Sequence, residues 1–329
     1  MIKKKKFLIL VKAVVSISLL LYIIFNIDWN EAAKNFYKAN YILLFTGFTL
    51  NILERVFLTH KWNILIRVRG IKISLFKLFL INSIGTFWGL FLPSSVGTDI
   101  IRGYYLVKNN SEKSISISSV FVDRILAMFS LLLLGVIAVI ISGDLLSEYN
   151  LNIYIIFLFV SSIVIFYFFQ KEETYNFIRL KLGKIRFKKL IDLFIKLHSS
   201  ILEYKKYKKS VLSSFLFNLL VQVTRVFTYY IISIAFNISI PIIYFLIFVP
   251  IVMIVLMLPI SIGGFGLSEG TFIAFFVLIG VSINDAVVIS FTNTFINTVN
   301  TLLGGVVYLF YTQPEKNKLV LKDNHSFRG

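Results

Sequence analysis

The chain of 329 residues contains no cysteine, which excludes disulfide bonds, thiolate metal sites and a cysteine nucleophile. It has only three histidines, His60, His198 and His325, and all of them fall in or beside basic stretches. The glycines miss the dinucleotide-binding fingerprint in their spacing, and no strand precedes them. Because no complete catalytic constellation can be assembled, we expect no enzymatic activity, no metal and no cofactor.

Acidic residues are also scarce, with 16 Asp and Glu against 34 Lys and Arg and a net charge of +18. Apolar residues are abundant instead: 57% of the chain is hydrophobic, against about 45 to 50% in soluble domains. The basic residues collect in short blocks between apolar runs, as they do in the cytoplasmic loops of membrane proteins. The composition therefore predicts a polytopic integral membrane protein whose partners are membrane lipids and not nucleic acid.

Apolar segments long enough to cross a bilayer recur along the whole chain. A hydrocarbon core about 30 Å thick requires roughly 20 apolar residues per helix. The candidate segments are residues 7–27, 41–60, 75–92, 119–142, 151–169, 210–236, 242–259, 265–281 and 284–311.

The charges of the loops predict the orientation of these segments. The basic residues from Lys61 to Lys72 mark a short cytoplasmic loop, whereas the acidic connection 143–150 is expected outside. An odd number of crossings must separate these two loops, yet two candidate segments lie between them. The parity is restored if 75–92, which polar residues and glycines interrupt, enters and leaves on the same side. We therefore expect an all-α polytopic protein of the cell membrane with about eight transmembrane helices, one or two re-entrant segments and both termini cytoplasmic.

The chain divides into a transmembrane domain, residues 1–311, and a short cytoplasmic tail, residues 312–329. Within the first lies a long basic loop, 171–209, which mixes apolar residues such as Leu190 and Phe194 with lysines. This pattern is typical of an amphipathic helix on an anionic leaflet. A docking surface for a partner protein is the alternative.

A short sequence occurs twice. Leu92–Gly97 (LPSSVG) is echoed by Leu258–Gly263 (LPISIG), and an acidic residue follows each within a few positions, Asp99 or Glu269. Paired proline and glycine interruptions in two halves of a chain are typical of transporters whose binding site lies at a repeat interface. Alternatively, two unrelated helix ends share these residues because both residues terminate helices. An internal repeat is thus one of two interpretations.

Three segments carry a family resemblance: residues 92–102 (LPSSVGTDIIR), 122–124 (VDR) and 258–270 (LPISIGGFGLSEG). With them the chain resembles the lysylphosphatidylglycerol synthase transmembrane-region family, flippase-like integral membrane proteins, from about Phe7 to Tyr311. The resemblance implies a membrane domain that moves an aminoacylated phospholipid between leaflets after a separate soluble domain has made it.

Two features separate this chain from that pattern. Thr98 stands where the family often has glycine, and Ser268 stands where it often has an arginine able to contact an anionic head group. The identity of the lipid is therefore left open. Only 18 residues follow Tyr311, too few for an aminoacyl transferase domain, so we expect that this chain alone does not synthesise the lipid.

Ionisable groups inside membrane spans are the first candidates for a site, because each costs at least about 2.5 to 3.5 kcal/mol to insert. Asp99 and Arg102 share a helix face. They either contact a lipid head group or serve as a helix cap and a snorkelling side chain. Asp123 and Arg124 open the segment 119–142 and, being adjacent, need separate partners. Arg124 suits a bidentate contact with phosphate or a structural role at the interface.

Arg225 lies well inside its segment and requires either an acid, such as Glu269, or a lipid phosphate. Gly263 and Gly264 precede an apolar helix, where free backbone N–H groups form an anion site. Glu269 follows them, and it either belongs to that site or stabilises the helix dipole.

The last apolar segment carries a row of asparagines, Asn293, Asn297 and Asn300, along one helix face. The row either lines a groove for a head group or forms hydrogen bonds between helices. Two glycines after it, Gly304 and Gly305, favour close helix packing.

We predict that this chain translocates or handles a lipid with a polar head group, of the phospholipid or aminoacyl-phospholipid kind, driven by an existing gradient or by a partner. The alternative is a membrane scaffold or accessory subunit for an enzyme of lipid or glycolipid synthesis. Convergence of the charged candidates on one open cavity favours transport, whereas pairing in packed protein favours the scaffold. The predicted substrate-binding residues are Asp99, Arg102, Arg124, Arg225, Gly263, Gly264, Glu269, Asn293 and Asn297.

Overall fold

The computed structural model describes residues 34–92, 96–110, 113–143, 198–258 and 260–311, together with a few single residues near 14–25 and 157–164. Throughout these ranges every regular element is helical and no strand occurs. The expected helices 7–27 and 151–169, most of the basic loop 171–209 and the tail 312–329 lie outside the described residues. So do Pro93 and Pro259.

Among the described residues, four helices are long and apolar enough to cross a membrane: α3 (Tyr41–Val68), α6 (Lys113–Ser142), α10 (Lys208–Ala235) and α13 (Ile283–Phe310). A helix of 28 residues is about 42 Å long, which exceeds a hydrocarbon core of about 30 Å. The short 3-10 helix η2 (Glu203–Tyr207) leads into α10. These helices confirm the all-α membrane fold that the sequence predicts.

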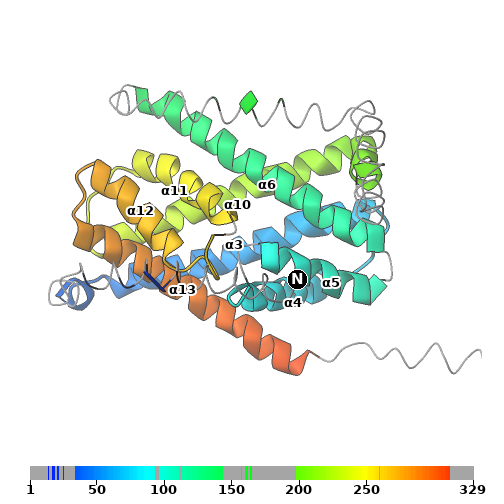
Figure 1. The fold of residues 1–329 in the computed structure, drawn as a ribbon, viewed down its shortest axis with the longest axis horizontal. Helices are drawn as coiled ribbons and strands as arrows, with labels where there is room; N and C mark the ends of the chain where they lie inside the picture. The colour runs from blue at the N-terminus through cyan, green and yellow to red at the C-terminus, as the bar shows by residue number, and fades with distance from the viewer. Residues whose placement is uncertain are drawn as a thin grey trace, which may run out of the picture.

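Four shorter helices form two pairs, α4 (Leu75–Gly89) with α5 (Val96–Asn110) and α11 (Ile242–Met257) with α12 (Leu267–Leu278). Figure 1 shows the first pair at one end of the bundle and the second pair at the other. The 15 residues of α4 span only about 22 Å, as expected of a re-entrant segment. The total of eight crossings stays a prediction.

The apolar run after α10 is broken into shorter helices than the expected segments 242–259 and 265–281. Leu258 is extended, which ends α11. Gly263, Gly264 and Gly266 then adopt φ angles of 62°, 83° and 76°, in the region that favours glycine. The backbone therefore turns between α11 and α12 where a continuous helix is not allowed.

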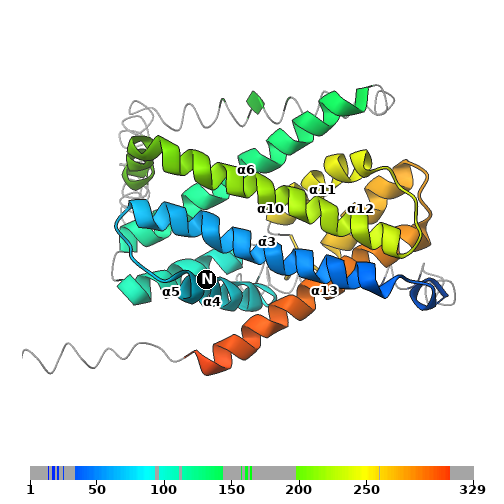
Figure 2. The same ribbon diagram turned by 180° about the vertical axis from the view of Figure 1, so that it is seen from behind.

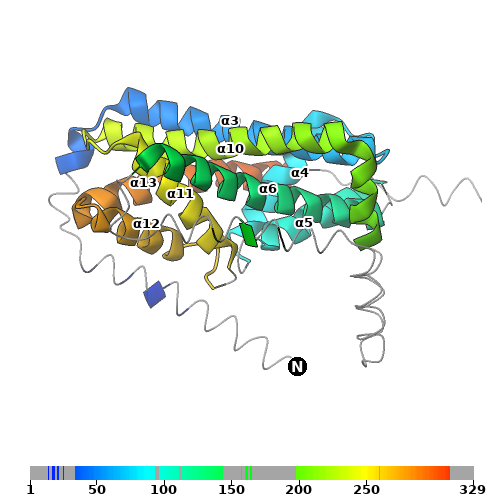
Figure 3. The same cartoon turned by 90° about the horizontal axis from the view of Figure 1, so that it is seen from above.

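The two long helices α3 and α10 are antiparallel and lie side by side (Figure 2). Asn40 ties their ends together: its side chain accepts the N–H groups of Ile42 and Leu43, and its own N–H donates to Ala235 at 2.7 Å. Seen from above, α3 and α10 lie on one side of the bundle and α5 and α12 on the opposite side (Figure 3).

An aromatic cluster holds α10, α11 and α12 together. The rings of Phe272 and Phe276 stack with centroids 4.1 Å apart, and Tyr229 stacks on Phe272 at 5.0 Å. Phe245 of α11 lies against both phenylalanines, and all four side chains are fully buried. Lipid tails are as apolar as these side chains, so no hydrophobic force drives helices together in a membrane. Close packing of this kind stabilises the bundle instead.

Glycines let α13 approach α4 closely, as the sequence predicts for Gly304 and Gly305. A Cβ atom at Gly304 would overlap the backbone of Ser83, and one at Gly305 would meet the ring of Phe87 at 2.5 Å. The breaks in the two short helix pairs also meet, because the N–H of Gly263 donates to the carbonyl of Leu92 at 3.3 Å. The two interrupted segments therefore contact each other.

Candidate functional site

A buried carboxylate on α6 joins three helices. Asp123 Oδ1 lies 2.8 Å from the amine of Lys61 on α3, and its Oδ2 lies 3.1 Å from the guanidinium of Arg102 on α5. Asp123 is 3% exposed and Lys61 is 2% exposed. Arg102 also stacks over the ring of Trp62, with 4.3 Å between the guanidinium carbon and the ring centroid.

The predicted cytoplasmic loop begins too early, because Lys61 belongs to α3. Helix α3 runs on to Val68, so Lys61 and Arg67 lie inside it, and only Arg69 and Lys72 follow it. His60 likewise lies within α3, where its ring packs against Phe217 at 4.5 Å. Helix α3 continues past its apolar run. Polar side chains in its last turns, such as Lys61, are buried against polar partners on other helices.

Asp99 extends the same ionic network. It stands in the first turn of α5, where the helix dipole favours an acid, and it accepts from Arg102 at 3.3 Å, as their spacing predicts. It also accepts from Arg124 of α6, whose Nε lies 2.8 Å away. Arg102 is 7% exposed, so it points into the bundle and does not snorkel.

Adjacent residues on α6 have separate partners, as expected: Asp123 contacts Lys61 and Arg102, whereas Arg124 contacts Asp99. The two residues do not open their helix, since α6 begins at Lys113, about three turns earlier. The network Lys61–Asp123–Arg102–Asp99–Arg124 thus holds three cations and two acids inside the bundle.

Arg225 pairs with Glu54 of α3 and not with the suggested Glu269. It also donates to Gln222 at 2.9 Å. The antiparallel contact of α3 and α10 decides the partner: Lys61, two turns after Glu54, donates to Asn218, two turns before Arg225. This register was not deducible from either segment alone.

Arg55, which the sequence analysis did not select, is a cation whose hydrogen bonds all go to uncharged oxygens in the described part of the chain. It donates to Thr86 at 3.0 Å, to the side chain of Asn297 at 3.2 Å and to Thr301 at 2.6 Å. Its Nε is buried without a hydrogen-bond partner. An arginine within an apolar segment is the signal that could have identified it.

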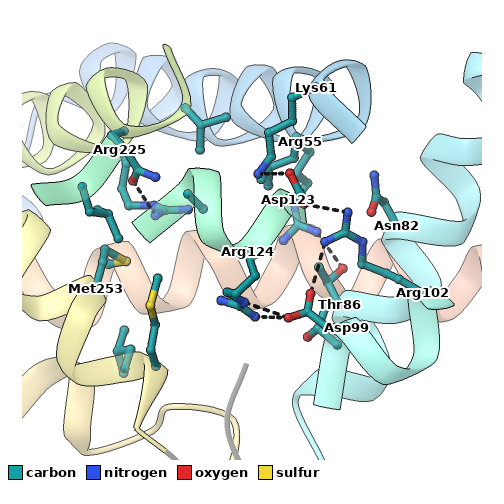
Figure 4. A pocket seen from close by; sticks show the side chains of 18 of the residues that line it. Arg55, Lys61, Asn82, Thr86, Asp99, Arg102, Asp123, Arg124, Arg225 and Met253 are labelled. Atoms are coloured by element: carbon teal, nitrogen blue, oxygen red, sulfur yellow. Dashed lines mark hydrogen bonds and ion pairs between the residues drawn. The ribbon is translucent and has the colours of Figure 1, made fainter. Parts of the chain in front are cut away.

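A cavity of about 270 Å³ lies among these side chains (Figure 4). Apolar residues such as Leu58, Phe79 and Met253 complete its wall. Among the residues that the structure describes, five cations line it against two acids, and Glu54 beside Arg225 still leaves two positive charges in excess. The charged lining residues are Arg55, Lys61, Asp99, Arg102, Asp123, Arg124 and Arg225.

A second cavity of about 150 Å³ adjoins the first, and the two share Arg225, Met253 and Leu256. Gly263, Gly264, Glu269, Asn293 and Asn297 all line it, as do Glu54 and Thr294. The predicted site residues therefore line two neighbouring cavities. Asp99, Arg102 and Arg124 line the first cavity, and Arg225 lines both cavities.

Glu269 is 1% exposed and has two donors, the N–H of Gly266 at 2.7 Å and the hydroxyl of Thr294. The contact with Gly266 caps the start of α12, which agrees with the expected role of Glu269 in stabilising the helix dipole. The N–H of Gly263 is occupied by Leu92 and that of Gly266 by Glu269. These two N–H groups are thus not available to an anion.

The asparagine row of α13 divides between the two roles considered for it. Asn300 donates to Asn51 at 2.8 Å and links α13 to α3. Asn293 and Asn297 line the second cavity, and Asn297 also accepts from Arg55. The charged candidates pair with one another and also line cavities. They therefore fit neither the open cavity expected of a transporter nor the packed pairs expected of a scaffold alone.

Comparison with known proteins identifies relatives. The family described as "Lysylphosphatidylglycerol synthase TM region" matches residues 9–304. The chain is 28% identical to the UPF0104 membrane protein MJ1595 of Methanocaldococcus jannaschii over 158 residues. This match covers 46% of the chain and 47% of that relative, about half of the length of each. No solved structure matches the chain.

Proposed function

Because the chain belongs to the lysylphosphatidylglycerol synthase TM region family, we propose that it translocates or handles a polar-headed lipid between the leaflets of a membrane. The observation that carries this proposal is the cavity of about 270 Å³, lined by five cations and two acids. Charges inside membrane helices are costly, so an excess of one sign favours a ligand of the opposite sign.

A phosphate group matches this cavity chemically. Guanidinium groups bind phosphate in a bidentate manner, and Arg55 has a buried Nε that no acceptor in the described part of the chain satisfies. The two aspartates, Asp99 and Asp123, provide acceptors for an ammonium group on the same head group. The volume is well above the roughly 15 Å³ that one water molecule requires. The site therefore suits an anionic phospholipid or one with an aminoacylated head group.

The alternative, a scaffold or accessory subunit for a lipid-synthesis enzyme, has one observation in its favour. Glu54, Asp99 and Asp123 each contact a cation of the protein, as they would in purely structural packing. A scaffold requires no ligand in the cavity, so lipid transport separates the two functions.

The test is leaflet-resolved transport in proteoliposomes with dithionite-quenchable phospholipids that carry anionic, zwitterionic or cationic head groups. The variant is Arg55→Gln, which keeps hydrogen-bond donors and removes the charge. Its matched control is Arg67→Gln, on the exposed end of the same helix. A charge-assisted contact of about 1.5 to 3 kcal/mol predicts at least a tenfold loss of anionic-lipid transport in the first variant and none in the control.

Absence of transport of every lipid by the folded wild-type protein would reject the transport function and favour the scaffold. Equal transport of all head groups, unchanged in Arg55→Gln, would reject the cavity as the head-group site.

A further inference from the structure

An apolar groove of about 450 Å³ lies between α5 and α6, next to the charged cavity. Ile100, Gly103 and Tyr104 line it on α5, and Ile117, Val120 and Phe121 line it on α6. Helix α5 has only a glycine at position 103, where a Cβ atom would meet nothing closer than Val120 at 3.9 Å. The missing side chain therefore contributes to the depth of the groove.

The groove opens on the outer surface of the bundle. Ile100 is 64% exposed and Phe121 is 49% exposed, although both are large and apolar. In a membrane protein such exposed apolar side chains face the hydrocarbon of the bilayer. The opening of the groove is thus suited to contact with lipid tails.

The groove and the charged cavity share two residues, Asp99 and Arg124, which bond to each other. This ion pair closes the junction between an apolar space and a polar one, and Figure 4 shows the two side chains pointing toward each other. The side chain of Arg124 is 32% exposed, against 8% for Arg102 and 4% for Asp123. Arg124 is therefore the outermost member of the network.

We infer that the α5–α6 groove binds an acyl chain of the lipid whose head group enters the charged cavity, and that the Asp99–Arg124 pair is the gate between the two. This inference rests on the proposed function and adds a lateral entrance, between α5 and α6, through which the lipid reaches the charged cavity. The two spaces have the chemistry of the two ends of a phospholipid. The groove is lined mostly by apolar side chains, with Lys113 beside them, and the cavity is lined by an excess of positive charge. A phosphate arriving between α5 and α6 meets Arg124 first and replaces Asp99 as its partner.

The test uses an anionic phospholipid with a diazirine at the end of one acyl chain, reconstituted with the full chain, and peptide mapping by mass spectrometry after illumination. We expect labelling of residues 100–121 to exceed labelling of the exposed apolar face of α10, at Leu212, Leu216 and Leu220, by at least fivefold. Gly103→Leu fills the groove and should reduce the labelling to the level of α10. Ala274→Leu, on an exposed position of α12, should leave it unchanged.

Equal labelling of the groove and of α10 in the wild-type protein would overturn the inference without requiring any variant to fold. Unchanged labelling in folded Gly103→Leu would overturn it as well. Transport measured in the same proteoliposomes separates the two proposals. Lipid transport without groove labelling refutes only the acyl-chain site, whereas groove labelling without transport refutes only the translocation function.

Discussion

Removal of the carboxylate of Asp123 is expected to destabilise the bundle more than any other single change in the ionic network. Its two cations lie at 2.8 and 3.1 Å. At an effective dielectric constant of 20, each attraction amounts to about 5 to 6 kcal/mol before the cost of burying the charges is subtracted. Loss of one member of a buried ion pair typically costs about 3 to 5 kcal/mol. Asp123→Ala leaves two buried cations uncompensated, so we expect a loss at the upper end of that range.

The matched variant is the double change Asp123→Asn with Lys61→Met, which removes one positive and one negative charge at similar volume. Arg102 then keeps Asp99 as its acid. Replacing a buried ion pair by uncharged groups is often nearly neutral. We therefore expect the double variant to recover at least about 2 kcal/mol relative to Asp123→Ala.

The assay is reversible unfolding of the purified protein in mixed micelles, analysed as a double-mutant cycle with Asp123→Asn and Lys61→Met alone. A positive coupling energy above about 1 kcal/mol is expected. If Asp123→Ala costs less than about 1 kcal/mol, or if the two single effects simply add, the electrostatic account of this network is wrong.

Four further changes follow from the same structure and use the same unfolding assay. Gly304→Val places a side chain against the backbone of Ser83 and should cost about 1 to 3 kcal/mol, whereas the Cβ atom of Gly103→Ala meets only Val120, at 3.9 Å, and should cost little. Glu54→Gln weakens the acid that faces Arg225 and should cost about 1.5 to 3 kcal/mol. Glu269→Gln keeps an amide oxygen that can accept from Gly266 or Thr294, and it loses the negative charge at the start of α12, about 0.3 to 1 kcal/mol, so equal losses in the two variants would contradict the assigned partners.

Several properties of the site were readable from local sequence. The spacing of Asp99 and Arg102 fixes their common helix face, and the structure confirms their contact at 3.3 Å. Gly304 and Gly305 were identified as packing glycines because helices in membranes approach closely only at small residues. Each of these predictions depends on neighbours within a few positions of one helix.

The partners across helices were not readable in this way. Arg225 contacts Glu54 because α3 and α10 are antiparallel with a particular register, and Glu269 instead accepts from Gly266 and Thr294. Arg55 entered the site for the same reason, since its partners lie on α4 and α13. No periodicity within one segment contains that information.

The sequence by itself determined the class of the protein. Long apolar runs separated by basic blocks indicate membrane helices, because a helix satisfies its backbone hydrogen bonds within one segment of the bilayer core. The interruptions at residues 75–92 and 258–266 were visible too, because glycine and polar residues act locally on helix length.

Only the tertiary structure decided where the charges go. It buried Lys61 beside Asp123, although position 61 looked like the start of a basic loop, and it joined a charged cavity to an apolar groove through Asp99 and Arg124. Attraction between charges depends on distance in space and on burial, and both are set by how α3, α5, α6 and α10 pack against one another.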